Sequence, residues 1–429
     1  MIFFIILLLM LTAFIFVGCA LTKKIYNPIT IINMIYIVWL LVGRLGYLGQ
    51  FKPSYESSLF IQFNILIIDM FIIMGYGIKS NGILRLKKIT INSEKIFKCL
   101  RMISFLISIA VLFRMVMGLL TGTLLFGEVR NISYSVAFDS KDYEQIYYNS
   151  VVYYSYQYLV RGFAFFDFSF NYARFLKNRR KIPVLSIVNF ILFIIIMQSR
   201  NEFMKITLFL VIFTLFANIR LTPSQKKLLK RICFFMGIAV IILFSLRTLN
   251  TEKNVFINTI DSFIVDFSGS NYMFSEFYDQ VSRGNRLIDS PIILKYMGGF
   301  GYLIEYPLRL VGIVYDHSVV NSYLGQGHYI GSSDHYNAFY TMFFEFMNSG
   351  GFIGCIIFSI IIGFVVGRLY RKMIVKDSIK SIYTAAFAVY IVAMGTYNYT
   401  ISGLTSVVIL TCLFIANDID IRRDGASYE

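Results

Sequence analysis

The sequence predicts an all-α polytopic membrane protein with about eleven transmembrane helices, within a range of ten to twelve, and one large, partly helical outward loop. Hydrophobic residues make up 57% of the 429-residue chain and charged residues only 15%, whereas roughly 25% of an ordinary soluble domain is charged. The apolar residues fall into repeated blocks of about 17 to 22 residues, the length that crosses a ~30 Å hydrocarbon core. A string of soluble domains is therefore excluded.

Eight predicted spans precede the outward loop and three follow it: 2–22, 28–49, 58–78, 99–121, 151–173, 183–198, 203–219, 232–249, 348–367, 381–397 and 400–417. They divide the chain into a first membrane region (1–249), the loop (250–347), and a second membrane region with a cytoplasmic tail (348–429). The first span resembles a signal peptide but lacks a basic start, so we expect an uncleaved helix.

The formal net charge of +16 is distributed along the chain in alternate connections. Six basic clusters occupy residues 23–24, 79–101, 174–181, 220–231, 368–380 and 422–423. Because Lys and Arg are retained on the cytoplasmic side, all six are predicted inside, which puts the amino terminus outside and the loop 250–347 outside. Short basic segments at the ends of apolar helices do not form the contiguous basic face that nucleic-acid binding requires. We therefore expect no nucleic-acid partner.

Neither the cysteines nor the histidines predict a metal site. The five cysteines are isolated, with no CxxC pair, and are interpreted as packing residues. His317, His328 and His335 have spacings that match no compact metal-ligand motif, and we expect no metal and no cofactor. Tyrosines between 134 and 158 are interpreted as an interfacial belt, with sugar stacking as the alternative.

The first candidate site is the segment 334–354, DHYNAFYTMFFEFMNSGGFIG. Asp334, or Ser332 and Ser333 before it, is predicted to cap a helix whose first turn presents His335 and Asn337 at the mouth of the membrane domain. A histidine there can take a proton from a sugar hydroxyl or hydrogen-bond a phosphate. The alternative is a histidine that only anchors the loop.

The second candidate is QSRNEFMK, residues 198–205, in a tight outward turn between two spans. A guanidinium held there, on Arg200, suits bidentate binding of a phosphate. Glu202 and Lys205 would orient it. The alternative is an interfacial arginine that contacts lipid headgroups.

The third candidate is the segment 282–309, which carries three arginines. Arg283 and Arg286 are three residues apart and would share one face of a helix. Arg309 completes this basic set. The glycines at 298, 299 and 301 favour a plain turn over a phosphate loop, because no strand precedes them.

Charged residues also lie inside the predicted spans: Arg44, Asp69, Arg114, Arg161 and Asp167. Ionised groups at membrane depth usually pair or line a polar cavity. Asp69 and Arg161 lie at similar predicted depth, so we predict that they pair.

Four features of the chain resemble Wzy-type O-antigen polymerases, oligosaccharide repeat-unit polymerases related to the O-antigen ligases. They are the NPITIINMIYIVWLL run from Asn27, the SRNE turn at Arg200, the late outward loop, and the run YTMFFEFMNSGGFIGCIIFSIIIGFVVGRLYRK. In the ligase relatives a loop histidine directly precedes an asparagine, with an acidic residue eight positions beyond. Asn337 and Glu345 keep that step of eight, but Tyr336 intervenes after His335.

The resemblance implies a metal-independent glycosyltransferase in the bacterial cytoplasmic (inner) membrane that polymerises undecaprenyl-diphosphate-linked repeat units on the outer side. A flippase and a chain-length regulator would be its partners in polysaccharide biosynthesis. A diphosphate is already an activated leaving group, so Arg200 with Arg283 or Arg286 would hold it and His335 would act on the acceptor hydroxyl. Asp334, Asn337, Glu345 and Arg309 would complete the substrate site. An O-antigen ligase and a flippase or other transporter are the alternatives, and the long loop favours an enzyme.

Overall fold

The computed structural model describes residues 1–78, 93–125, 128–129, 132, 142–198, 200–218, 222–223, 225–227, 230, 255–326, 328–331, 335–336 and 340–416. Within these ranges the side chains of residues 200, 201, 255, 256, 258–260, 262, 263, 266, 335 and 336 are not described. The predicted span 232–249 and the basic clusters at 220–231 and 422–423 lie wholly or largely outside the described residues.

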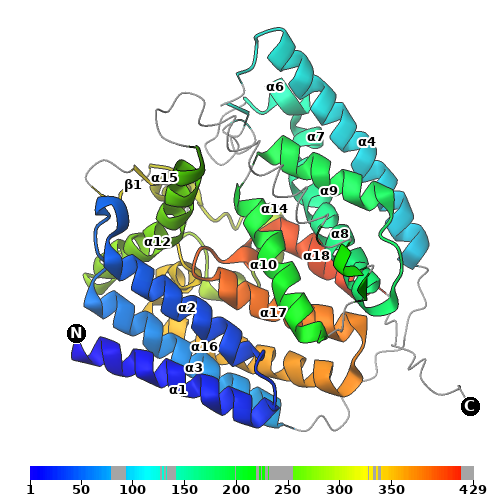
Figure 1. Cartoon of the computed structure of the whole chain (residues 1–429). Coiled ribbons are helices and arrows are strands. Elements are labelled where there is room, and N and C mark those ends of the chain that lie inside the picture. The colour runs from blue at the N-terminus through cyan, green and yellow to red at the C-terminus, as the bar shows by residue number, and fades with distance from the viewer. Residues whose placement is uncertain are drawn as a thin grey trace, which may run out of the picture.

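The described part of the chain is helical almost throughout (Figure 1). Five helices are long and apolar enough to cross a membrane: α1 (Ile2–Thr22), α2 (Pro28–Leu45), α3 (Tyr55–Gly77), α4 (Ser93–Leu120) and α16 (Met342–Lys376). Three apolar helices are shorter: α9 (Val184–Met197), α17 (Ile379–Met394) and α18 (Leu404–Ile415). Each of these eight falls on a predicted span. The all-α membrane class is therefore confirmed, whereas a count of eleven spans stays a prediction.

The other described elements are η1 (Tyr47–Gly49), α6 (Glu144–Tyr147), α7 (Ser150–Tyr154), η3 (Ser155–Val160), α8 (Arg161–Asn178), α10 (Arg200–Ala217), α12 (Val255–Ser282), α13 (Ile292–Tyr296), α14 (Gly299–Leu310), α15 (Ser318–Gln326), β1 (His328–Tyr329), β2 (His335–Tyr336) and η4 (Thr400–Ser402). The segment η3 is one π-helical stretch between α7 and α8. The predicted span 151–173 therefore corresponds to α7, η3 and α8 in succession.

Local sequence explains where several helices begin. The Asn27 side chain accepts a hydrogen bond from the Thr30 amide at 3.1 Å, and Pro28 occupies the first helical position of α2. Ser54 and Ser378 cap α3 and α17 in the same way. Gly46, with φ of 64°, ends α2 in the left-handed conformation that glycine adopts without strain.

α3 and α16 pack backbone to backbone through small residues. A Cβ added to Gly367 would lie 2.2 Å from the Ile72 carbonyl oxygen, and one added to Gly363 would lie 2.5 Å from that of Ile68. Gly75 of α3 makes the reciprocal approach to α16. These glycines form the G-x-x-x-G pattern GFVVG, which brings apolar helices close together in membranes. The helices α3 and α16 form one layer of the molecule together with α1 and α2 (Figure 1).

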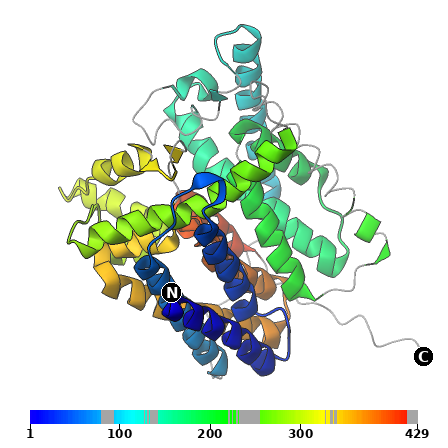
Figure 2. The ribbon, with the colours of Figure 1, turned by 60° about the vertical axis from the view of Figure 1, so that its left-hand side comes forward.

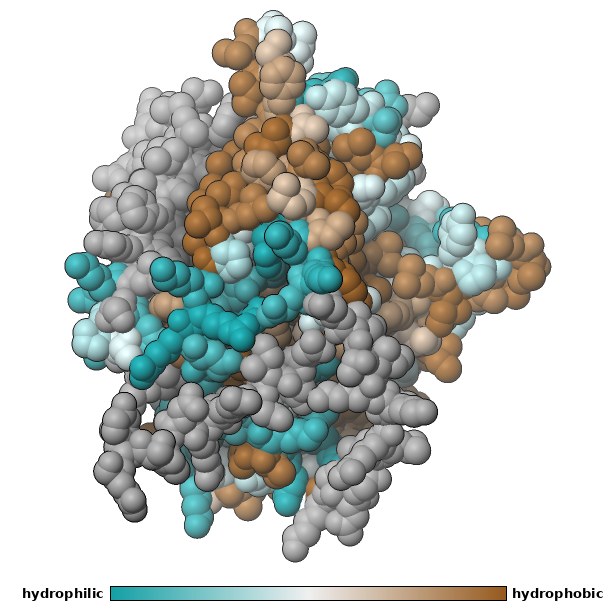
Figure 3. Space-filling model, turned by 90° about the vertical axis from the view of Figure 1, so that its right-hand side faces the viewer, coloured by the Kyte–Doolittle hydropathy of each residue, from teal (hydrophilic) through white to brown (hydrophobic). Residues whose placement is uncertain are grey.

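Basic helix ends meet on one face of the molecule. Arg174 Nη2 lies 2.6 Å from Glu94, and Lys177 Nζ lies 3.0 Å from Asp377. Lys380 donates at 2.9 Å to the carbonyl of Ala416. Figure 3 shows hydrophilic residues gathered in the middle of the face that looks to the right in Figure 1, with hydrophobic surface above them. These contacts join the basic clusters 79–101, 174–181 and 368–380, and the side of the membrane on which the clusters lie stays a prediction.

The predicted ion pair between Asp69 and Arg161 is wrong. Asp69 is buried and accepts a hydrogen bond from Asn33 Nδ2 at 2.8 Å. Arg161 instead forms an ion pair with Glu202. Similar depth does not decide the partner, because α3 packs on α2, which carries Asn33, whereas α8 packs on α10.

Two local predictions in the outward loop are also wrong. The chain does not enter a helix at Asp334: residues 335–336 form β2, antiparallel to β1, and α16 begins at Met342. Arg283 and Arg286 share no helix face, because α12 ends at Ser282. A turn with Gly284 at φ of 91° follows directly, and it carries the chain away from the helix axis.

Within the segment 250–347, the long helix α12 packs on the end of α2. Trp39 Nε1 donates to the Phe267 carbonyl at 2.8 Å, and the Tyr47 hydroxyl donates to Asp261 at 2.7 Å. Figure 2 shows α12 crossing beside the end of α2. Beyond the loop, α16 is kinked at Gly351, with φ of 61° and ψ of −155°. The kink separates a nine-residue first piece, which carries Glu345, from the long second piece of α16.

Candidate functional site

Five ionisable side chains form a cluster between α13, α14 and the first piece of α16. We call it the carboxylate cluster, and its members are Asp289, Lys295, Glu305, His317 and Glu345. Asp289 and Glu305 are buried, with side chains only 3% and 5% exposed. Ionisable groups at such exposure need partners, and here they partner one another.

His317 bridges two carboxylates. Its Nδ1 lies 2.9 Å from Asp289 Oδ2 and its Nε2 lies 2.6 Å from Glu305 Oε2. Only the imidazolium form donates from both ring nitrogens. The hydrogen bond to Asp289 raises the pKa of His317, against an opposing effect of burial, and Glu305 adds to the rise. His317 therefore keeps its positive charge to a higher pH than an ordinary histidine, and it is not a free base.

Lys295 holds the other side of the cluster. Its Nζ lies 3.0 Å from the Asp289 carboxylate and 2.9 Å from Glu345 Oε2. Burial alone would lower the pKa of Lys295, but the charges of Glu345 and Asp289 outweigh it and raise that pKa. Burial would likewise raise the pKa of Asp289, yet the bonds from His317 and Lys295 hold it below its usual value. Asp289 is thus an anion held by two cations.

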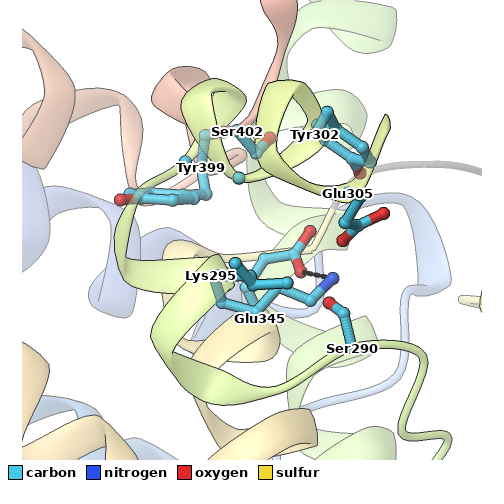
Figure 4. A pocket seen from close by; sticks show the side chains of 10 residues that line it. Ser290, Lys295, Tyr302, Glu305, Glu345, Tyr399 and Ser402 are labelled. Carbon is cyan, nitrogen blue, oxygen red and sulfur yellow. Dashed lines mark hydrogen bonds and ion pairs between the residues drawn. The ribbon is translucent and has the colours of Figure 1, made fainter. Parts of the chain in front are cut away.

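Three members of the cluster, Lys295, Glu305 and Glu345, line a small cavity (Figure 4). Its wall includes Ser290, Lys295, Tyr302, Glu305, Glu345, Tyr399 and Ser402, and the volume is about 10 Å³. Such a space holds about one water molecule or the tip of one hydroxyl group. Only a single small polar group fits inside this cavity.

Glycines bring the walls of this cavity together. A Cβ on Gly298 would lie 2.6 Å from the Ile401 carbonyl oxygen, and one on Gly299 would lie 2.4 Å from that of Gly403. Gly301 makes the same approach to Leu294. The three glycines therefore pack α14 against the turn that precedes α18 and against α13. This close packing accounts for them without a phosphate loop.

A second group of charges lies where α8 and α10 begin. We call it the basic cluster: Arg161, Lys205 and Glu202. Arg161 and Lys205 both pair with Glu202, and the Lys205 Nζ to Glu202 distance is 2.8 Å. Glu202 is buried, with a side chain 4% exposed. Arg161 also donates to Gln157 of η3 at 3.3 Å. The sequence predicts that Glu202 and Lys205 orient Arg200. In the structure Glu202 pairs with Arg161 and Lys205, and since the Arg200 side chain is not described, its orientation by these two residues stays a prediction.

The two clusters flank the same turn. Ser402 lines the cavity of the carboxylate cluster. Thr405, three residues later, donates to the Gln157 carbonyl at 3.3 Å, beside Arg161. Three residues span at most about 10 Å even when fully extended. A substrate lying over residues 400–405 would therefore be close to both clusters.

Of the predicted site residues whose side chains are described, Glu345 alone belongs to the carboxylate cluster. Arg283, Arg286 and Arg309 are exposed. Arg286 nevertheless lies beside the kink of α16, where its guanidinium is 3.6 Å from a Cβ added to Gly351. The structure does not describe the side chains of Arg200 and His335. It describes no part of Asp334 or Asn337. The roles of these four residues therefore stay predictions.

Sequence reasoning did not single out Asp289, Lys295 or Glu305, and it considered His317 only as a weak metal ligand. One signal was available: Glu305 is the lone acid in the apolar run GYLIEYPL, and an isolated carboxylate in such a run needs a buried partner. Asp289, Glu305 and His317 do lie together. Even so, no group of three His, Cys, Asp or Glu side chains suited to a metal ion occurs among the described residues.

Neither a protein family, nor a curated protein, nor a solved structure matches the chain.

Proposed function

We propose that this protein is a polyprenyl-diphosphate-dependent glycosyltransferase that polymerises lipid-linked oligosaccharide repeat units at the outer face of the bacterial cytoplasmic membrane. The observation that carries the proposal is the pair of charged clusters on either side of residues 400–405, one basic and one rich in carboxylates. Glycosyl transfer from a diphosphate requires cations for the leaving group and a base for the acceptor hydroxyl.

The donor diphosphate would bind to exposed arginines near the carboxylate cluster. Arg283 and Arg286 are exposed cations on the segment that continues into the cluster at Asp289. Since Arg286 and Asp289 are three residues apart, their Cα atoms lie within about 10 Å. Arg309 is exposed at the end of α14, one turn beyond Glu305. Arg200 stands at the start of α10 beside Glu202 and Lys205, where helix amides also favour an anion.

The proposed reaction transfers a glycosyl group from a diphosphate to a hydroxyl group, and it includes no metal or cofactor. The acceptor hydroxyl oxygen bonds to the anomeric carbon of the donor sugar, and the bond from that carbon to the diphosphate breaks. The polyprenyl diphosphate leaves with the electron pair, and the hydroxyl proton passes to a base. Glu345, at the cavity wall, and His335 are the candidates for that base. His317 is not one, because its two carboxylate partners favour its protonated form.

A test of catalysis uses the full-length protein in lipid nanodiscs with purified lipid-linked repeat units. Wild-type protein should produce a ladder of longer chains on a gel. Glu345→Gln should slow chain growth by about 10²- to 10⁴-fold if it is the base. The matched control is Glu144→Gln, which neutralises an exposed carboxylate on α6. Failure of the wild-type protein to extend any acceptor would refute the transferase.

The arginines can be separated by the same assay. Arg200→Ala, Arg283→Ala and Arg286→Ala should abolish polymer while the protein remains in the membrane. Arg200→Lys should rescue poorly, because a lysine cannot form the bidentate fork. Lys52→Ala removes an exposed cation elsewhere and serves as the control. Normal chain length with Arg200→Ala would exclude Arg200 from the donor site.

A carrier remains the alternative of a different class, and the basic cluster is the observation that favours it. Ionisable side chains inside a helix bundle often mark a transport path. His335→Ala separates the two. If the protein is a polymerase, single lipid-linked repeats should accumulate on the outer side of the membrane. If they accumulate only on the inner side, the protein moves them. An O-antigen ligase would instead transfer glycan to a lipid A core acceptor and give no ladder.

A further inference from the structure

The helix α14 presents an apolar stripe to its surroundings. Phe300, Leu303, Tyr306 and Leu310 recur every three to four residues, so they share one face. They are 37%, 50%, 71% and 79% exposed, respectively. The stripe continues beyond the helix in Val311 and Val314, and α13 adds Ile293, all well exposed.

The opposite face of α14 is buried and holds different residues. Gly301 packs against the backbone of Leu294, and Glu305 points into the carboxylate cluster. The buried face of the helix thus carries a glycine and a glutamate, whereas its exposed face carries large apolar side chains. In water, such a contiguous apolar surface is unfavourable and marks a binding surface.

The position of α14 identifies what covers this stripe. Gly299 packs directly on the backbone of Gly403, the residue before α18, and α18 is one of the apolar helices of the membrane region. At 12 residues α14 is about 18 Å long, too short to cross a bilayer. It also carries Pro307 in its interior and Arg309 in its last turn. A short amphipathic helix beside the end of a membrane helix, with tyrosine and arginine at its border, is typical of an interfacial helix.

We propose that α14 and residues 311–314 lie in the outer interface of the lipid bilayer, with the apolar stripe among the acyl chains and Arg309 at the phosphate headgroups. The occupant of the stripe is thus phospholipid. The lipid contact is continuous with the lipid-facing surface of the membrane helices. It would hold the carboxylate cluster, on the other face of the same helix, directly at the membrane surface. This inference concerns the membrane contact alone and does not rest on the proposed transferase.

Fluorescence quenching by lipid tests the contact directly. The chain has a single tryptophan, Trp39, which is fully buried and supplies a constant background. Tyr306→Trp and Leu310→Trp each add one indole on the stripe. In nanodiscs of phosphatidylcholine brominated on its acyl chains, the emission of the added indole should fall about twofold or more relative to unbrominated lipid. Wild-type protein gives the Trp39 signal to subtract.

The control is Asn321→Trp, at an exposed position on α15 away from the stripe. Its emission should be the same in the two lipids. Equal emission of Tyr306→Trp in both lipids would overturn the proposal, whatever second protein or second copy then proved to cover the stripe. Tyr306→Trp exchanges one aromatic side chain for another at an exposed site. The quenching experiment can therefore still be carried out with this variant if Leu310→Trp fails to fold. Since no activity is measured, failure here is distinct from failure of the transferase.

Discussion

The side chain of His317 is one source of pH sensitivity in the segment 250–347. Its pKa is raised in the folded protein by Asp289 and Glu305. The stabilisation from this group is therefore fully present below the unfolded-state pKa of about 6.5, and it is lost as the pH rises through the higher folded-state pKa. Asp289 has the opposite sign: its lowered pKa contributes stability that is lost only under acid conditions.

We predict that amide hydrogen exchange in α13 and α14, corrected for intrinsic rates, is faster at about pH 9 than at about pH 6. His317→Gln cannot be protonated, so in that variant the exchange should be fast at both pH values. His328→Gln is the matched control, because His328 faces Glu276 instead of the carboxylate cluster. If the exchange rates of His317→Gln depended on pH as those of the wild-type protein do, the bridge from His317 to the two carboxylates would contribute nothing to the stability of α13 and α14.

Lys295 provides a second residue-scale prediction. Replacing it by methionine leaves Asp289 and Glu345 without their shared ammonium group, and removing one partner of a buried pair costs about 3 to 5 kcal/mol. The free energy of unfolding in detergent should fall by that amount. Lys295→Met combined with Glu345→Gln should recover part of the loss, since one of the two stranded charges is gone. Additive losses in the double variant would contradict the pairing.

Among the elements, the contact between α3 and α16 depends on glycine. Gly367→Ala places a methyl group 2.2 Å from a carbonyl oxygen before relaxation, so the helices must separate. Overpacking of this kind costs about 1 to 3 kcal/mol. The thermal midpoint in detergent should fall for Gly367→Ala but not for Gly77→Ala, whose added Cβ meets nothing within 4 Å. Equal midpoints for the two variants would mean that the backbones are not in close contact.

The elements also show what sequence could predict. Long apolar blocks predict α1 and α3 to within three residues at each end, because the bilayer sets their length. The positions of α12 to α15 cannot be predicted from the sequence in this way, because these helices mix polar and apolar residues and gain their stability from packing. The carboxylate cluster could not be predicted either. Its members come from four separate segments, and only the tertiary contacts of α13 and α14 with α16 and η4 bring them together.

At the scale of the whole molecule, the charge pattern makes a prediction about sidedness. Basic ends of α8, α16 and α17 meet near Glu94 and Ala416, and this face is predicted to be cytoplasmic. Position 325, in α15, should then lie outside. In a cysteine-free background, Gly325→Cys should react with a membrane-impermeant maleimide added to intact cells. Reaction only after the cytoplasmic side is opened would overturn both the topology and the location of the site.

The kink of α16 restricts which mutations the gene can tolerate. Gly351 has φ of 61° and ψ of −155°, a conformation essentially closed to residues with a side chain. Every missense change of a glycine codon adds a side chain, so none of them reproduces this backbone. In a saturation mutagenesis library under selection, codon 351 should therefore retain glycine alone, whereas codon 77, at the free end of α3, should accept many residues.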